Sequence, residues 1–149
     1  MINARWLVLG VPVIGAIAIA AYGLSLMGSP SRSVLDAGKP GRALYEARCS
    51  ICHGVELQGQ PNWMTRLSTG RLPAPPHDET GHTWHHSDQQ LFTIVKFGLG
   101  AIAPGYETDM PAFEGTLSDT EIQSILDYIK STWSDRAKAF QAKRTEAEK

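Results

Sequence analysis

Apolar residues fall into one long uninterrupted run and three shorter periodic stretches along the chain. The run covers residues 6–28, which carry no charged side chain and, as a helix of about 35 Å, are long enough to cross a bilayer core. In the stretches 39–53, 87–98 and 118–133, apolar residues recur at the i, i+3 and i+4 spacing of one helix face. The pattern therefore predicts an all-α protein in which three amphipathic helices follow an apolar N-terminal segment.

The second and third helices carry recognisable start and stop signals. Ser87 with Gln90, and Ser118 with Glu121, fit the capping-box spacing, in which two side chains satisfy free backbone N–H groups of the first turn. Gly98 ends the second helix, because glycine readily adopts the backbone conformation that follows a helix. These signals predict helices that start directly after the two serines.

The apolar run at 6–28 has two interpretations. It is either a membrane anchor or a cleaved signal peptide, in which Arg5 would provide the basic start and Ala18–Ala20 an A-x-A cleavage site. The run continues for several residues past that site, which favours the uncleaved anchor. We therefore expect residues 1–28 to be a single-pass transmembrane helix in a bacterial cytoplasmic membrane, with the rest of the chain on the periplasmic side.

The rest of the chain divides into three parts. Residues 29–38 are rich in small and polar residues, as in a linker, and 39–134 hold the periodic stretches. Residues 135–149 form a charged tail expected to be a solvated helical extension or a frayed end. Within the central part, 54–86 and 99–117 show no periodic pattern. Such long loops in a small domain make sense when they enclose something other than protein. We therefore expect three to five helices and long loops around a large apolar cofactor.

The charge balance excludes one class of partner. The formal net charge is −1, from 14 Lys and Arg against 15 Asp and Glu, so no basic field attracts nucleic acid. Aromatic residues make up 8% of the chain and are scattered, so they form no stacking platform. The chain is not expected to bind nucleic acid.

The candidate chemistry lies in the hexapeptide CSICHG, which holds the only two cysteines of the chain. C-x-x-C-H is the attachment signature of c-type haem. On a helix, Cys49 and Cys52 share one face and can reach the two vinyl groups of one porphyrin, while His53 can direct its imidazole to the iron from the same side. The motif therefore predicts one covalent haem c, and its single occurrence argues against a second.

Three other chemistries of a cysteine pair fit less well. A zinc site needs four ligands, yet no further cysteine exists, and the histidines at 82, 85 and 86 lie about thirty residues away. A redox-active dithiol would open a helix after a strand, whereas this pair closes a helix. A structural disulfide is compatible with export but leaves His53 unexplained.

A low-spin haem iron needs a second axial ligand, and two methionines are candidates. Met110 lies in a loop after the second helix, where Pro111 keeps the residue before it extended. Met64 follows the cysteine motif and is the alternative. We predict Met110, because its loop lies far enough from Cys52 along the chain to wrap around a porphyrin. Ligation by His53 and a methionine raises the reduction potential and suits electron transfer.

Taken in order, these motifs resemble those of class I cytochromes c. GRALYEARCSICHG is similar to that family's N-terminal helix and haem-attachment motif, DMPAF to its axial-methionine loop, and LSDTEIQSILDYIKSTW to its C-terminal helix. The resemblance covers about residues 38–134. It implies the small cytochrome c fold wrapped around one covalent haem, with the first helix crossing the last where Gly41 and Tyr45 lie near Tyr128. It also implies that a proline carbonyl faces the ring N–H of the axial histidine. The candidates for that carbonyl are Pro73, Pro75 and Pro76.

The resemblance does not explain a histidine-rich segment between the motifs. The segment contains His77, His82, His85 and His86. One interpretation is a second metal site, for copper for instance, since imidazole suits that metal. The other is that these side chains cap the second helix, bind loop backbone or line the haem edge. The second interpretation needs no further ligand and is preferred.

We interpret the chain as a membrane-anchored monohaem electron carrier rather than an enzyme, because two filled axial positions leave no iron site for a small-molecule substrate. Its expected partners are a redox donor and a redox acceptor in membrane complexes. One alternative is a permanently bound haem subunit of a larger oxidoreductase or of a respiratory or photosynthetic complex. Another is a haem sensor or peroxidase-like enzyme in which Met110 dissociates.

Overall fold

The structure, a computed structural model, describes residues 40–149. The predicted anchor at 1–28 and the linker at 29–38 lie outside the described residues. Every regular element between residues 40 and 149 is a helix, so the prediction of an all-α protein is confirmed for this part of the chain. None of the helices in that range is both long and apolar enough to cross a membrane.

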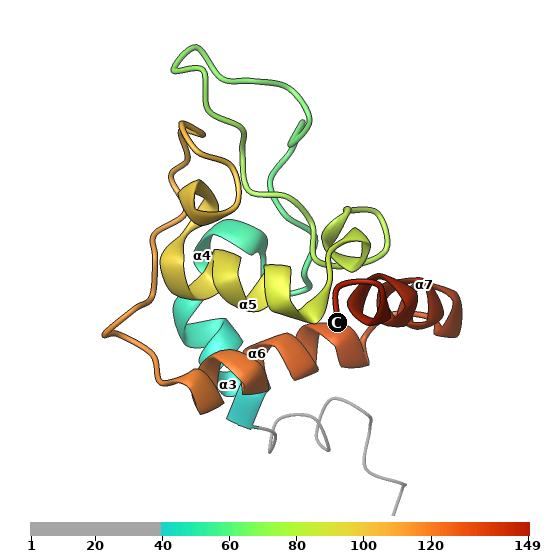
Figure 1. Ribbon diagram of the computed structural model, residues 1–149. Coiled ribbons are helices and arrows are strands. Elements are labelled where there is room, and N and C mark those ends of the chain that lie inside the picture. Colours follow the sequence, from blue (N-terminus) through green and yellow to red (C-terminus); the bar gives the residue numbers. More distant parts are fainter. Residues whose placement is uncertain (1–39) are drawn as a thin grey trace, which may run out of the picture. The chain divides into compact units, whose positions relative to one another are not determined.

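The described part contains five α-helices and two short 3₁₀ helices (Figure 1). In chain order they are α3 (Pro40–Arg48), α4 (Ser50–His53), η1 (Thr83–His85), α5 (Asp88–Phe97), η2 (Leu99–Ala101), α6 (Asp119–Ser131) and α7 (Asp135–Glu146). α6 packs against both α3 and α5, and α7 packs against η1. The loops predicted at 54–86 and 99–117 are largely irregular, except that the short helices η1 and η2 lie within them, which leaves 54–82 and 102–118 as loops.

The predicted first helix is interrupted once, at Cys49, which separates α3 from α4. The N–H of Cys49 donates to the carbonyl of Tyr45 (2.8 Å), and the Cys49 carbonyl accepts from the N–H of His53 (2.9 Å). Gly54 ends α4 with a φ of 77°, the left-handed region that glycine adopts without strain. The cysteine motif therefore occupies a helical turn of its own.

The two predicted capping boxes differ in the structure. At α6 the box is complete, because the side chains of Ser118 and Glu121 each bond to the other's backbone N–H. At α5 only half forms: the Ser87 hydroxyl accepts from the N–H of Gln90, while the Gln90 amide donates to Glu148 beyond α7 (2.6 Å). The predicted box at α5 is wrong because the Gln90 side-chain oxygen, which would accept from the Ser87 N–H, instead pairs with Nδ1 of His86 (3.1 Å).

The centre of the domain is the crossing of α3 over α6 (Figure 1). Tyr45 is fully buried there, and its ring centroid lies 5.5 Å from that of Tyr128. A methyl group added at Gly41 would lie 1.9 Å from the carbonyl oxygen of Ser124, so the backbones meet too closely for any side chain at this position. The expected contact between the first and last helices of the motif order is confirmed.

Gly41→Ala is expected to destabilise the holoprotein by about 1–3 kcal/mol, because overpacking of a tight core forces backbone shifts. Gly100→Ala is the matched control, since nothing lies within 4 Å of a methyl group added there. Thermal unfolding followed by circular dichroism measures both variants. Equal unfolding midpoints for Gly41→Ala and Gly100→Ala would show that α3 and α6 can move apart without loss of stability.

The C-terminal segment is a packed helix, not the solvated extension expected from its charge. Ala137 and Gln141 of α7 are buried, and the ring of Phe140 packs at 5.3 Å from that of Trp84. Arg144 also donates to the carbonyl of His85 (3.2 Å). The contact surface is made by one aromatic ring, a small residue and an amide, so it left little apolar periodicity in the sequence.

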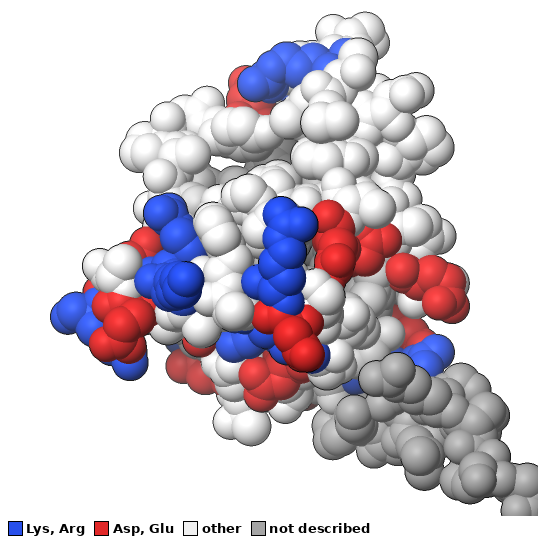
Figure 2. Space-filling view, turned by 90° about the vertical axis from the view of Figure 1, so that its right-hand side faces the viewer, with Lys and Arg blue, Asp and Glu red and all other residues white. Residues whose placement is uncertain are grey.

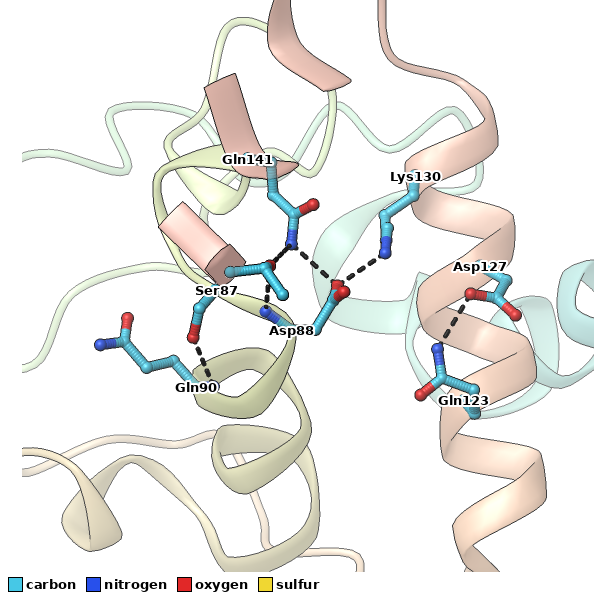
Figure 3. A network of polar contacts seen from close by, with 8 residues as sticks. Ser87, Asp88, Gln90, Gln123, Asp127, Lys130 and Gln141 are labelled. Carbon is cyan, nitrogen blue, oxygen red and sulfur yellow. Dashed lines mark hydrogen bonds and ion pairs between the residues drawn. The ribbon is translucent and has the colours of Figure 1, made fainter. Parts of the chain in front are cut away.

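A polar network joins α7 to the start of α5 and to α6 (Figure 3). Asp88 accepts from Lys130 at 2.6 Å and from the Gln141 amide at 2.8 Å, and its own N–H donates to Thr145 at 3.0 Å. The carboxylate thus lies in the first turn of α5, where the positive end of the helix dipole favours it. The network fixes α7 across the histidine-rich segment.

Candidate functional site

The cysteine turn presents two free thiols in different surroundings. Cys52 is exposed, whereas Cys49 is partly buried and packs against the hydrophobic core. Burial raises the pKa of the Cys49 thiol to about 11, and the neighbouring Cys52 adds to the shift. Both thiols lie in or next to α4, one turn from His53, so a single rigid turn offers all three side chains to one group.

His53 is buried, and its imidazole is oriented by one hydrogen bond. Its Nδ1 lies 2.8 Å from the carbonyl oxygen of Pro75. A carbonyl only accepts, so Nδ1 carries the proton and Nε2 keeps its lone pair. Burial lowers the pKa of His53, partly offset by that hydrogen bond. The ring is therefore a neutral imidazole with Nε2 ready to bind a metal, the form found in metal ligands.

Pairing between two loop segments places Pro75 opposite His53. The N–H of Gln60 donates to the Ala74 carbonyl (2.9 Å), and the N–H of His77 donates to the Leu57 carbonyl (2.7 Å). Leu57 is itself buried. Of the three candidate prolines, Pro75 is the one whose carbonyl meets the ring, and the expectation of such a contact is confirmed.

His77 forms a contact with His53 that the sequence did not predict. The two rings stack with centroids 4.0 Å apart and planes 20° apart. The Nδ1 of His77 lies 2.9 Å from the hydroxyl oxygen of Thr83. Burial, together with the nearby His53 and His82, lowers the pKa of His77 well below its ordinary value. The only sequence feature that could have indicated this contact is the position of His77, two residues after Pro75.

Met110 lies on a separate loop, and two contacts tie that loop to the segment before Pro75. Asp109 forms an ion pair with Arg71, and the guanidinium of Arg66 lies 5.9 Å from the ring centroid of Tyr106. The N–H of Met110 donates to the Thr108 hydroxyl (3.0 Å). The structure thus brings the cysteine turn and His53 together and holds Met110 on a loop of its own.

The two candidate methionines differ in exposure. Met110 is partly buried, whereas the side chain of Met64 is 75% exposed. Beyond Met110, the chain is pinned to α5, since the N–H of Phe113 donates to the Val95 carbonyl (3.1 Å). Burial and this anchorage favour Met110 over Met64.

The remaining histidines each have a local partner. The ring of His82 stacks on Trp63 with centroids 5.4 Å apart, His85 packs on Trp84 at 3.8 Å, and His86 hydrogen-bonds Gln90 at 3.1 Å. Within residues 40–149, no group of three or more His, Cys, Asp or Glu side chains is arranged to hold a metal ion. The structure therefore gives no support to a copper site in this segment.

Large apolar side chains remain exposed on α4, at the end of α5 and on the loops. They are Ile51, Val55, Met64, Leu67, Phe97 and Ile102. Figure 2 shows that the upper part of the face it presents, where Figure 1 places the loop after residue 60, is uncharged apart from one group of basic and acidic side chains near its top, while charges of both signs mix below. These exposed apolar side chains, together with the free Nε2 of His53 and two thiols in one turn, fit a large apolar metal cofactor such as haem.

A comparison with known families agrees with this geometry. The family described as cytochrome C oxidase, cbb3-type, subunit III matches residues 36–129. The chain belongs to this family. Membership in this cytochrome family establishes covalently bound haem c as the cofactor and electron transfer by a haem c domain as the coarse function. The predictions of a cytochrome c and of haem c are confirmed.

Two relatives among characterised proteins are similar over most of this chain. The cbb3-type cytochrome c oxidase subunit FixP of Bradyrhizobium sp. (strain ORS 278) is 30% identical over 77% of this chain and 34% of its own length. The fructose dehydrogenase cytochrome subunit of Gluconobacter japonicus is 30% identical over 68% of this chain and 20% of its own length. The chain thus spans about a third or less of either relative. No solved structure matches the chain.

Haem supplies a one-electron ferrous–ferric couple when it is bound to a cytochrome of this family. The residues of this chain do three things toward that chemistry. His53 holds its proton on Nδ1 and so keeps Nε2 available as a ligand atom. The Pro75 carbonyl fixes the direction of the ring, and α3 packs the turn against the core.

Proposed function

We propose that the chain is a monohaem electron carrier whose haem is attached to Cys49 and Cys52, with the iron between His53 Nε2 and Met110 Sδ. The single observation that carries this proposal is the hydrogen bond from His53 Nδ1 to the Pro75 carbonyl (2.8 Å), beside two free thiols. It leaves one imidazole nitrogen free on the same turn as both thiols. Electron transfer then needs no substrate site and no proton donor.

The second part of the proposal is that the carrier is anchored in a bacterial cytoplasmic membrane and works on the periplasmic side. It is supported by the 6–28 run, which carries no charge, and by the polar stretch at 29–38. Ten linker residues reach roughly 33 Å when extended, so a tethered domain stays close to membrane partners. A high local concentration then replaces tight docking, and a net charge of −1 provides little steering in any case.

The anchor is tested by separating membrane and soluble fractions and sequencing the N-terminus of the mature protein. We expect the haem protein in the membrane fraction with residues 1–28 retained. Recovery from the soluble periplasmic fraction with an N-terminus at Ala21 would identify the run as a cleaved signal peptide instead.

A second candidate function is a fixed haem subunit of a larger oxidoreductase. It is favoured by the names of both relatives, each of which is a subunit of another enzyme. Gentle detergent extraction followed by size-exclusion chromatography separates the two candidates. A lone haem-containing particle supports the free carrier, whereas a stoichiometric partner that co-elutes through high salt supports the subunit.

A further inference from the structure

A second imidazole, that of His77, lies against the face of the candidate haem ligand His53. The rings of His53 and His77 are nearly parallel, at 20°, with centroids 4.0 Å apart. The two rings are therefore in face-to-face contact, at a separation shorter than the roughly 4.5–7 Å between the centroids of most aromatic pairs in proteins. His77 lies outside the C-x-x-C-H motif, so haem attachment does not account for it.

Contacts at three points hold His77 in place. Its N–H donates to the Leu57 carbonyl (2.7 Å), its carbonyl accepts from the indole N–H of Trp133 (2.8 Å), and its Nδ1 meets the Thr83 hydroxyl (2.9 Å). Thr83 is buried and its hydroxyl also donates to the Pro76 carbonyl (3.3 Å). Because that hydroxyl donates its hydrogen to Pro76, it accepts from His77 Nδ1. Backbone and ring are therefore both fixed.

We propose that His77 is a positioning residue that fixes the plane of the His53 ring through the stack and lowers the reduction potential of the haem. This inference rests on the proposed assignment of His53 as an axial ligand. It adds a residue of this chain that sets the properties of that ligand.

The expected direction of the effect follows from charge. Oxidation of the iron places more positive charge on the ligand ring, and an aromatic face beside a positive group stabilises it. The stack therefore favours the ferric form over the ferrous form. Removing the aromatic face without opening a large void is expected to destabilise the ferric form and raise the potential.

The test measures the reduction potential and the ferric electron paramagnetic resonance spectrum of four purified variant holoproteins and compares each with the wild type. In His77→Leu we expect a shift of about fourfold in the ferric–ferrous equilibrium, which is about 35 mV upward for one electron, together with altered g values. His77→Phe keeps an aromatic face and is expected to stay within a quarter of that shift. His85→Leu is the matched control, an exposed histidine of the same segment, and is expected to match the wild type.

Thr83→Val keeps the test decisive if His77→Leu does not retain haem. It removes only the hydroxyl that orients His77 and leaves both rings in place. We expect altered g values with a potential close to that of the wild type. Wild-type g values in Thr83→Val, or equal potential shifts in His77→Leu and His77→Phe, would overturn the inference. Failure of the proposed function is seen separately, in a wild-type spectrum without histidine ligation, and would remove the basis of this inference as well.

Discussion

The variant Cys49→Ala/Cys52→Ala is expected to contain no covalent haem, whereas the wild type keeps its haem through denaturation. Both thioether bonds need a cysteine sulfur, and these are the only two cysteines in the chain. Haem staining after denaturing electrophoresis measures the loss. Ser50→Ala, in the same turn, is the matched control and should stain like the wild type. Extraction of haem from the wild type with acidified acetone would contradict covalent attachment by either cysteine.

The same double variant is also expected to lose cooperative unfolding. Ile51 is 90% exposed and Met64 75% exposed, and the loops at 54–82 and 102–118 contain little regular structure besides the turns. A bound haem that covers part of this surface stabilises the folded state by linkage, since it binds the native form and not the unfolded one. A haem-free chain that unfolds cooperatively near the midpoint of the holoprotein would show that α3, α5 and α6 form a sufficient core alone.

The sequence predicted the elements whose signals are local. Ser118 and Glu121 start α6 as expected, since a capping box needs only its own four residues. Gly98 likewise ends α5 with a φ of 85°. The cysteine turn could be recognised because haem attachment requires three side chains within five residues. Such features depend on neighbours in the chain and are therefore visible without the fold.

Features that depend on distant residues could not be predicted in the same way. The Gln90 amide donates to Glu148, 58 residues further along. The packing of α7 rests on the buried Gln141 and its bond to Asp88, and glutamine carries no burial signal in a sequence. The stack of His77 on His53 depends on the loop pairing around Pro75, which joins residues 57 and 60 to 77 and 74. In each case the decisive contact joins segments whose spacing in the chain varies freely.

In the candidate site, too, the local features could be predicted from the sequence and the contacts between distant residues could not. The motif was sufficient to select the turn that holds His53, while three prolines remained possible partners until the loop path showed the Pro75 carbonyl at 2.8 Å from the ring. The structure also favours Met110 over Met64, because Met110 is partly buried and Met64 is exposed. Ligation by Met110 is a prediction, and a pair of variants tests it.

Met110→Ala is expected to open one axial position of the iron, whereas Met64→Ala is expected to leave it filled. The pair is well matched, since both variants remove the same thioether from a loop, and only the burial of the side chain differs. Loss of the sulfur ligand removes its preference for the ferrous form, so the reduction potential of Met110→Ala should fall. The absorption band of sulfur-to-iron ligation in the red should disappear in Met110→Ala and persist in Met64→Ala.

Cyanide binding to the ferric protein gives the magnitude. If Met110 is displaced in about 10% or less of wild-type molecules, cyanide reaches the iron only in that fraction, and its apparent affinity falls in proportion. Met110→Ala makes every molecule competent, so the apparent affinity should rise by about tenfold or more. Met110 lies on the loop that the ion pair of Asp109 with Arg71 holds. If cyanide bound the wild-type iron as tightly as the iron of Met110→Ala, this loop would supply no ligand. An open-iron spectrum in Met64→Ala would transfer the assignment to the exposed methionine, whose loop would then have to close over the haem.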